Sequence, residues 1–282
     1  MNLWQQLDKL DRRWVFLLVW IAAVIPLIVP ATFKISISPE GKSLFEAVDR
    51  LPDSSTVILT FDIWPNALAE TEPMERAALH HLFRKNMYVI TVANIPLGGP
   101  SVAERVTREL AAQYGKTYGV DYVNLGYKPG YVSVLRGMGT SIEGIFPTDN
   151  SGTPLSELPL MQRVKNYEQV DFIFVVADNA TVDYWVSIVN AQFRKPVGAG
   201  VTAVMAPKQF AYVGSGQLVG LLGGMKGAAE YEKLVGKSGL ATTGMGMQSL
   251  VHFLLIALIV VGNVGYIVTR QVARTRERKV KA

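Results

Sequence analysis

The chain contains no cysteine, which excludes disulfides, catalytic thiols and thiolate metal sites such as a zinc ribbon. Histidine is also scarce, and the neighbours His80 and His81 would point about 100° apart on a helix, a poor geometry for a metal pair. Without disulfides the fold must be stabilised by its core, and a central region of about 200 residues is large enough to bury one. We expect neither a metal site nor a cofactor.

The middle of the chain carries almost no net charge. Two apolar segments lie near the ends of the chain. Outside them lie nine of the 28 Lys and Arg residues and three of the 23 Asp and Glu residues. Between them lie nineteen Lys and Arg residues and twenty Asp and Glu residues. The net charge of +5 therefore belongs to the flanks, where cations are attracted to anionic lipid headgroups. A near-neutral central region predicts no basic patch, so we expect no nucleic-acid partner.

Long hydrophobic runs are confined to Val15–Val29 and Leu250–Val268, each about long enough to cross a bilayer. They predict transmembrane helices at residues 15–31 and 248–268. Because basic residues lie outside both runs, the positive-inside rule places residues 1–14 and the basic tail 269–282 in the cytoplasm. The region 34–240 is then an extracytoplasmic domain, and the lipid bilayer is the first expected partner.

The first run is also compatible with a cleaved signal peptide, since charged residues precede it and Pro30-Ala31 follows it. No clear small-x-small cleavage motif is present, which favours an uncleaved anchor.

Between the runs, short apolar stretches alternate with amphipathic ones. The expected strands are residues 56–61, 87–93, 121–125, 171–176, 201–206 and 210–213. The expected helices are residues 39–51 behind an N-cap at Ser38, 70–85, 101–114, 132–136, 160–167, 180–193 behind Asn179, and 217–234. This alternation predicts a doubly wound, Rossmann-like α/β domain with a mostly parallel sheet covered by helices on both faces. Residues 236–246 are expected to form a linker into the second span.

Polar residues follow the predicted strands, where ligands bind in open parallel sheets. The candidate ligand-binding residues are Asp62, Asn94, Asn124, Asp178 and Ser215. Trp64 and Tyr127 are candidates for apolar walls. The alternative is that Asp and Asn cap helices and form turns at these positions.

Two more specific sites, for magnesium and for phosphate, would need residues that these positions supply only in part. A magnesium site would need a second carboxylate near Asp62, and Asp178 is the available one. The Gly214–Gly220 turn has the strand-to-helix context of a phosphate-binding loop but follows the last expected strand rather than the first. No complete catalytic set can be assembled, so catalytic residues are not assigned and the chain is not expected to be an enzyme.

The glycines of the last expected helix favour close packing. Gly216, Gly220 and Gly224 recur at four-residue spacing, although glycine costs about 1 kcal/mol relative to alanine in a helix interior. The close neighbour could be the sheet of the same chain or a helix of another subunit. In the second span Asn263 is a polar break that should face another helix, because an amide is costly in lipid.

Two functional hypotheses follow. The first is a membrane-anchored, non-enzymatic structural, scaffold or assembly subunit of a membrane complex, whose partners are further copies of itself or other membrane proteins. The alternative is an envelope receptor or enzyme that binds a small polar ligand at the carboxyl edge of the sheet.

Overall fold

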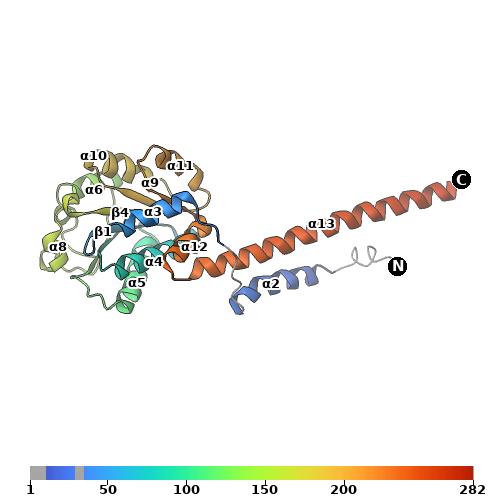
Figure 1. Ribbon diagram of the computed structural model, residues 1–282, viewed down its shortest axis with the longest axis horizontal. Coiled ribbons are helices and arrows are strands. Elements are labelled where there is room, and N and C mark those ends of the chain that lie inside the picture. The colour runs from blue at the N-terminus through green and yellow to red at the C-terminus, as the bar shows by residue number, and fades with distance from the viewer. Residues whose placement is uncertain (1–10, 29–34, 282) are drawn as a thin grey trace. The chain divides into compact units, whose positions relative to one another are not determined.

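The computed structural model describes residues 11–28 and 35–281 (Figure 1). The chain divides into two compact units, one spanning Ile35–Thr242 and one formed by the segments before and after it. The first ten residues of the expected cytoplasmic N-terminus and positions 29–31 of the expected first span lie outside the described residues.

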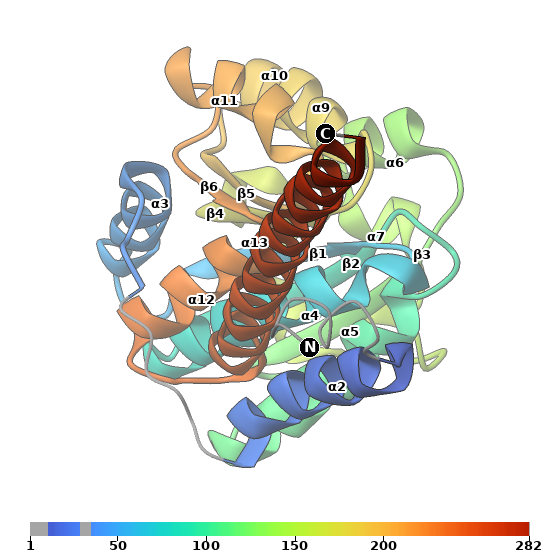
Figure 2. The ribbon, with the colours of Figure 1, turned by 90° about the vertical axis from the view of Figure 1, so that its right-hand side faces the viewer.

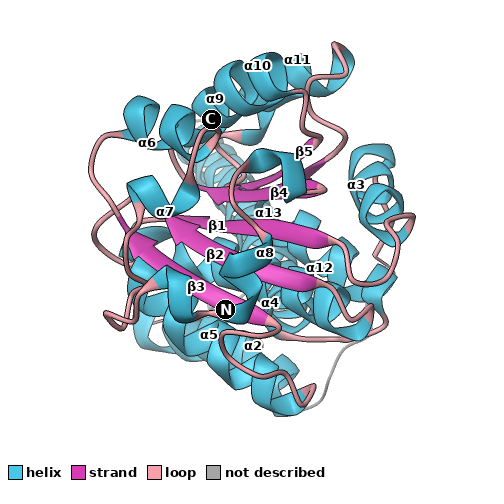
Figure 3. Cartoon of the chain, turned by 90° about the vertical axis from the view of Figure 1, so that its left-hand side faces the viewer, coloured by secondary structure: helices cyan, strands magenta, loops and turns pink. Residues whose placement is uncertain are grey.

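The Ile35–Thr242 unit contains one six-stranded sheet in the order β3-β2-β1-β4-β5-β6, with every pairing parallel (Figure 3). This confirms the predicted α/β class and is the strand order of Rossmann domains. Every residue of β1 and β4 is buried, as expected of strands covered on both faces. The strands are β1 Thr56–Asp62, β2 Tyr88–Ala93, β3 Tyr122–Tyr127, β4 Phe172–Ala177, β5 Val197–Val201 and β6 Leu221–Gly223.

Helices cover both faces of this sheet (Figure 2). One face is covered by α3 Pro39–Asp49, α4 Leu68–Arg84, α5 Gly99–Gln113 and α12 Gly224–Val235. The other is covered by α6 Tyr131–Met138, α7 Ile142–Ile145, α8 Pro159–Arg163, α9 Thr181–Tyr184, the π-helical turn η4 Trp185–Asn190, α10 Ala191–Phe193 and α11 Ala206–Gly214. Single 3-10 turns complete the connections at η1 Pro65–Ala67, η2 Leu155–Glu157 and η3 Tyr167–Gln169. As predicted, Ser38 caps α3, its hydroxyl accepting from the Gly41 backbone N–H.

The last part of the unit corrects the sequence-based prediction. Residues 201–206 and 210–213 do not form strands, because β5 ends at Val201 and residues 206–214 form α11. The expected helix 217–234 is instead the short strand β6 followed by α12. Short apolar runs fit a strand and a buried helix equally well, and two glycines within β5 weakened its strand pattern.

This correction separates the glycines expected to share one helix face. Gly216 lies in an exposed turn with φ +75° before β6, and Gly224 begins α12 with φ +62°. Gly220 precedes β6, and a Cβ there would lie 2.4 Å from the Leu44 backbone nitrogen and 2.6 Å from the Glu40 carbonyl oxygen. The close neighbour of Gly220 is therefore α3 of the same chain.

Replacing Gly220 by alanine is expected to lower the free energy of unfolding by about 1–3 kcal/mol, because the added methyl group meets backbone atoms that must move. Urea unfolding of the full chain in detergent measures the change. Gly214→Ala is the matched control, since nothing lies within 4 Å of a Cβ at that position. Equal midpoints for the two variants would contradict the close approach of α3.

A buried histidine joins α3, α4 and α12. The His81 side chain is fully buried, with Nδ1 2.9 Å from the Tyr231 hydroxyl and Nε2 3.3 Å from Asp49 Oδ1. Phe45 stacks on its ring at a centroid distance of 4.5 Å. Burial lowers the pKa of His81 to about 4, so the ring is neutral at pH 7 and serves this packing rather than a proton-transfer role.

One helix of the described residues is long and apolar enough to span a membrane. The apolar segment Leu240–Gln271 forms most of α13, which runs from Leu240 to Lys281. The other terminal helix, α2, covers about 26 Å over its 17 described residues Arg12–Ile28, less than a hydrocarbon core of about 30 Å, and residues 29–31 of the expected span lie outside the described residues. The structure thus supports one of the two expected spans. Nor do residues 236–246 form a linker, since α13 begins at Leu240.

Candidate functional site

The candidate site lies at the carboxyl ends of β1, β2 and β4 (Figure 3). β1 and β4 are neighbours at the centre of the sheet, and the helices that follow them, α4 and α9, lie on opposite faces. Ligands of open α/β sheets bind at such a switch point. The sequence placed Asp62, Asn94 and Asp178 at this edge, and the structure brings them together.

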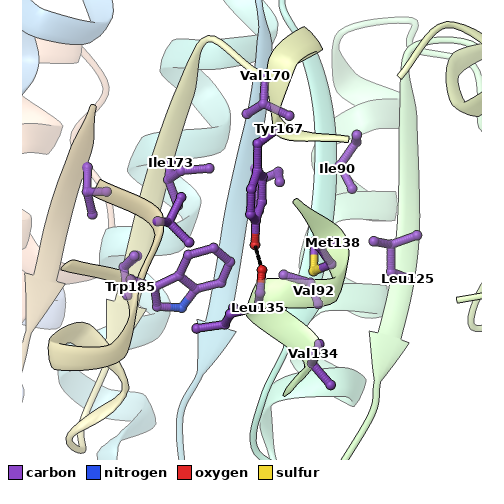
Figure 4. Packing of buried hydrophobic residues seen from close by; sticks show 14 of the residues in the cluster. Ile90, Val92, Leu125, Val134, Leu135, Met138, Tyr167, Val170, Ile173 and Trp185 are labelled. Atoms are coloured by element: carbon purple, nitrogen blue, oxygen red, sulfur yellow. Dashed lines mark hydrogen bonds between the residues drawn. The ribbon is translucent and has the colours of Figure 1, made fainter. Parts of the chain in front are cut away.

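Asp62 is the centre of the site. Its carboxylate is fully buried and accepts hydrogen bonds from the Asn94 backbone nitrogen at 2.7 Å, Asn94 Nδ2 at 3.1 Å and Trp185 Nε1 at 3.0 Å. The Trp185 ring packs in the same apolar cluster as Tyr167 (Figure 4). Burial raises the pKa of Asp62, while the hydrogen bonds from Asn94 and Trp185 lower it.

A second acid lies beside the first. The side chain of Asn179 donates both to the Asp62 carbonyl oxygen at 2.6 Å and to Asp178 Oδ1 at 2.9 Å. The Asp178 carboxylate also accepts from the Trp64 backbone nitrogen, at 3.2 Å to Oδ2. Unlike Asp62, Asp178 is partly exposed, so it is the acid of this edge that a ligand can reach.

Aromatic side chains lie close to these acids. The rings of Tyr131 and Tyr184 are 5.6 Å apart between centroids, and Tyr184 is exposed. Burial raises the pKa of Tyr131, and the nearby charges of Asp62 and Asp178 raise it further. Exposed apolar side chains follow the carboxyl ends of five strands, namely Trp64, Leu97, Tyr127, Val132, Tyr184, Val204 and Phe210. This edge of the sheet thus combines a buried polar centre with an apolar periphery.

One buried oxygen at the centre, Asn94 Oδ1, has no hydrogen-bond partner among the described residues. Thr181 begins α9 and lies near Asp62, where it contributes to lowering the pKa of that carboxyl. Buried polar atoms in proteins nearly always have a partner, which can be ordered water or a ligand. Asn94 Oδ1 is thus an acceptor that a further polar group at this site could use.

Glu75 of α4 is another buried acid, and neither of its carboxylate oxygens has a partner among the described residues. Burial raises its pKa well above the ordinary value, and the charges of Glu72 and Asp62 raise it further. Glu72 is held differently, because its hydrogen bonds with Arg105 and Arg76 outweigh the effect of burial and lower its pKa. The protonated form of Glu75 is therefore favoured in the folded chain relative to an exposed glutamate.

Glu75→Gln is expected to become progressively more stable than the wild type as pH rises above about 4.5. The folded wild type holds a proton that the unfolded chain releases, so it loses about 1.4 kcal/mol per pH unit until the folded pKa is reached. Urea midpoints at pH 5, 6, 7 and 8 measure the divergence, with Glu157→Gln as an exposed control. A difference that stays constant with pH would show that Glu75 is ionised in the fold.

Two predicted site residues lie elsewhere. Asn124 is buried on β3, where its Nδ2 donates to Glu104 Oε2 at 2.9 Å and its Oδ1 accepts from the Gly126 nitrogen. Ser215 follows α11 rather than a strand and lies toward the amino ends of the strands, because α11 returns the chain to the start of β6. Nearby, the Val219 nitrogen bonds the carbonyl of Val197, the first residue of β5.

Sequence reasoning missed Thr181, Trp185 and Tyr131 as members of the site. A tryptophan one turn into an expected helix is usually a core residue, so the pattern held no signal for its indole nitrogen. Tyr131 stood in an irregular stretch, although the Gly130 that precedes it marked the turn.

The site does not fit the cofactors of Rossmann domains. The turn after β1 runs Ile63-Trp-Pro-Asn-Ala67 and lacks the glycines that let a pyrophosphate approach the backbone. The Gly214–Gly220 turn also lacks the strand-to-helix context of a phosphate-binding loop, because α11 precedes the turn and β6 follows it. Among the described residues, no group of three or more His, Asp or Glu side chains could hold a metal ion.

Comparison with known proteins gives no relative from which a role could be transferred. No protein-family model, no curated protein and no solved structure matches the chain.

Proposed function

We propose that the chain is a membrane-anchored protein whose α/β domain lies outside the cytoplasm and serves as a non-enzymatic structural or assembly subunit of a membrane complex. The observation that carries the proposal is α13, in which residues 240–269 contain no Asp, Glu, Lys or Arg. The proposal takes the apolar part of α2 as a second span. Basic residues follow the apolar stretch of α13 and also precede that of α2, so by the positive-inside rule both ends would then be cytoplasmic.

The state of the strand-end acids supports a non-enzymatic role. The Asp62 carboxylate is buried and bonded by Asn94 and Trp185, and the Asp178 carboxylate is bonded by Trp64 and Asn179. Both acids thus serve the geometry of the sheet edge.

Extraction of the membrane-bound protein in a mild detergent, followed by native mass measurement and identification of every component, tests the proposal. We expect a defined assembly that contains further copies or fixed partner proteins. A strictly monomeric chain that co-purifies with nothing would contradict it. Protease treatment of intact and permeabilised cells separately tests which side of the membrane carries the α/β domain.

A second candidate function is the binding of a small polar ligand at the Asp62 edge. The unpartnered Oδ1 of Asn94, whose Nδ2 donates to the same Asp62 carboxylate whose charge acts on Tyr131, favours it. Binding should raise the melting temperature of the chain and change the fluorescence of Trp64. Unchanged melting across a broad panel of sugars, amino acids and divalent cations would count against this candidate.

A further inference from the structure

We infer that α13 associates with α13 of a second copy of this chain, through a polar stripe on one side of the helix. The inference rests on the proposed membrane function and names the partner. The polar stripe is defined by Gln248, His252, Asn263, Tyr266 and Arg270. At about 100° per residue, these side chains fall within an arc of about 60°.

Within the apolar segment 250–268, the rest of the helix surface is apolar. Between residues 250 and 268, every side chain outside the stripe is apolar or a glycine. A helix with such a surface turns its polar side toward protein, because polar side chains in hydrocarbon are costly without a partner. The described residues cover little of this segment, since 6% of its apolar window is buried. The stripe is therefore available to a partner helix.

Asn263 gives the stripe its chemical specificity. Its Nδ2 donates to the Ile259 carbonyl oxygen at 2.9 Å, one turn earlier in the same helix. Within the described part of the chain, the second Nδ2 hydrogen and the Oδ1 acceptor make no further hydrogen bond, so both can bind another molecule. Gly262 precedes Asn263, and a Cβ at Gly262 would meet nothing within 4 Å, so a second backbone can approach closely there.

The chain's other apolar helix is a poor complement. From Trp14 to Ile28, α2 offers no polar side-chain atoms except the indole nitrogens of Trp14 and Trp20. These nitrogens donate but accept nothing, so they cannot satisfy the free amide hydrogen of Asn263.

A second α13 satisfies both groups at once. Copies inserted with the same topology are parallel, so Asn263 of each lies at the same depth in the membrane. Each amide can then donate to the other's Oδ1, as paired buried asparagines do in parallel helix dimers. A two-fold interface of this kind is self-complementary and closed.

The absence of native cysteine permits a direct test in membranes. Ile259→Cys places a thiol within the arc of the stripe, and Val261→Cys, the matched control, places one about 200° away from it. With the full chain in native membranes, oxidation is expected to convert Ile259→Cys to a disulfide-linked dimer at least five times more efficiently than Val261→Cys. Adding Asn263→Leu should lower the Ile259→Cys dimer yield about fivefold, and Asn263→Gln should largely restore it.

Equal cross-linking from both positions, or none from Ile259→Cys, would overturn the inference. The stripe would then be covered by α2 or by another protein. Protease resistance of the α/β domain verifies that each variant folds. Membrane flotation separates the two proposals. A floating chain that co-purifies with other proteins but forms no Ile259→Cys dimer contradicts self-association alone, whereas a chain that does not float contradicts the membrane function itself.

Discussion

Replacing Asp62 by alanine is expected to lower the free energy of unfolding by about 3–5 kcal/mol, because several buried hydrogen-bond donors would lose the acceptor that they share. The Trp185 indole N–H and the Asn94 backbone and side-chain N–H groups would lose their acceptor in a fully buried place. For a domain of this size the change corresponds to a fall in melting temperature of roughly 6–20 °C. Differential scanning fluorimetry or circular dichroism of the full chain in detergent measures it.

Two further variants separate the carboxylate from general effects of substitution. Asp62→Asn keeps the shape and one acceptor oxygen, so we expect a loss of about 1–2 kcal/mol. Asp53→Ala removes an acid that is 70% exposed and should change stability by less than about 0.5 kcal/mol. A melting temperature of Asp62→Ala equal to that of Asp53→Ala would show that Asp62 does not organise this edge of the sheet.

The central strands could be predicted from the sequence because burial on both faces leaves a continuous apolar run, as in β1 and β4. β5 and β6 were not predicted correctly, because they are short and rich in glycine. Their structure is decided by tertiary contacts. Gly198 of β5 has Leu44 of α3 against it, where a Cβ would lie 2.2 Å from that side chain. Such a packing requirement leaves no periodic signal in a single sequence.

The same distinction applies to the candidate site. Because the carboxyl ends of parallel strands share one edge, the sequence could place Asp62, Asn94 and Asp178 together once the strands were recognised. The direction of each side chain decides the rest. Asn124 points into a separate network with Glu104, and the η4 turn brings the Trp185 indole to Asp62. Both depend on three-dimensional geometry that spacing along the chain does not specify.

The second large effect is expected where the α/β unit continues into α13. Glu232 of α12 is buried, and its carboxylate accepts from the backbone nitrogens of Gly239 at 3.0 Å, Ala241 at 2.9 Å and Thr242 at 2.8 Å. It also accepts from the Thr242 hydroxyl at 2.6 Å. These donors belong to the amino end of α13, which has no intrahelical partners for its first N–H groups. A carboxylate there also interacts favourably with the positive end of the helix dipole.

Glu232→Ala is expected to lower the free energy of unfolding by about 2–4 kcal/mol, the sum of a lost helix cap and of backbone donors left without an acceptor. Hydrogen exchange should show the loss at residues 239–242 first, because the first turn of α13 would open before the sheet does. Glu232→Gln retains an acceptor oxygen and should lose about half as much, while Glu157→Ala is the exposed control. Unchanged exchange at residues 239–242 in Glu232→Ala would mean that α13 begins independently of α12. Faster exchange there, with the sheet amides still protected, would make Glu232 the residue that fixes the start of α13.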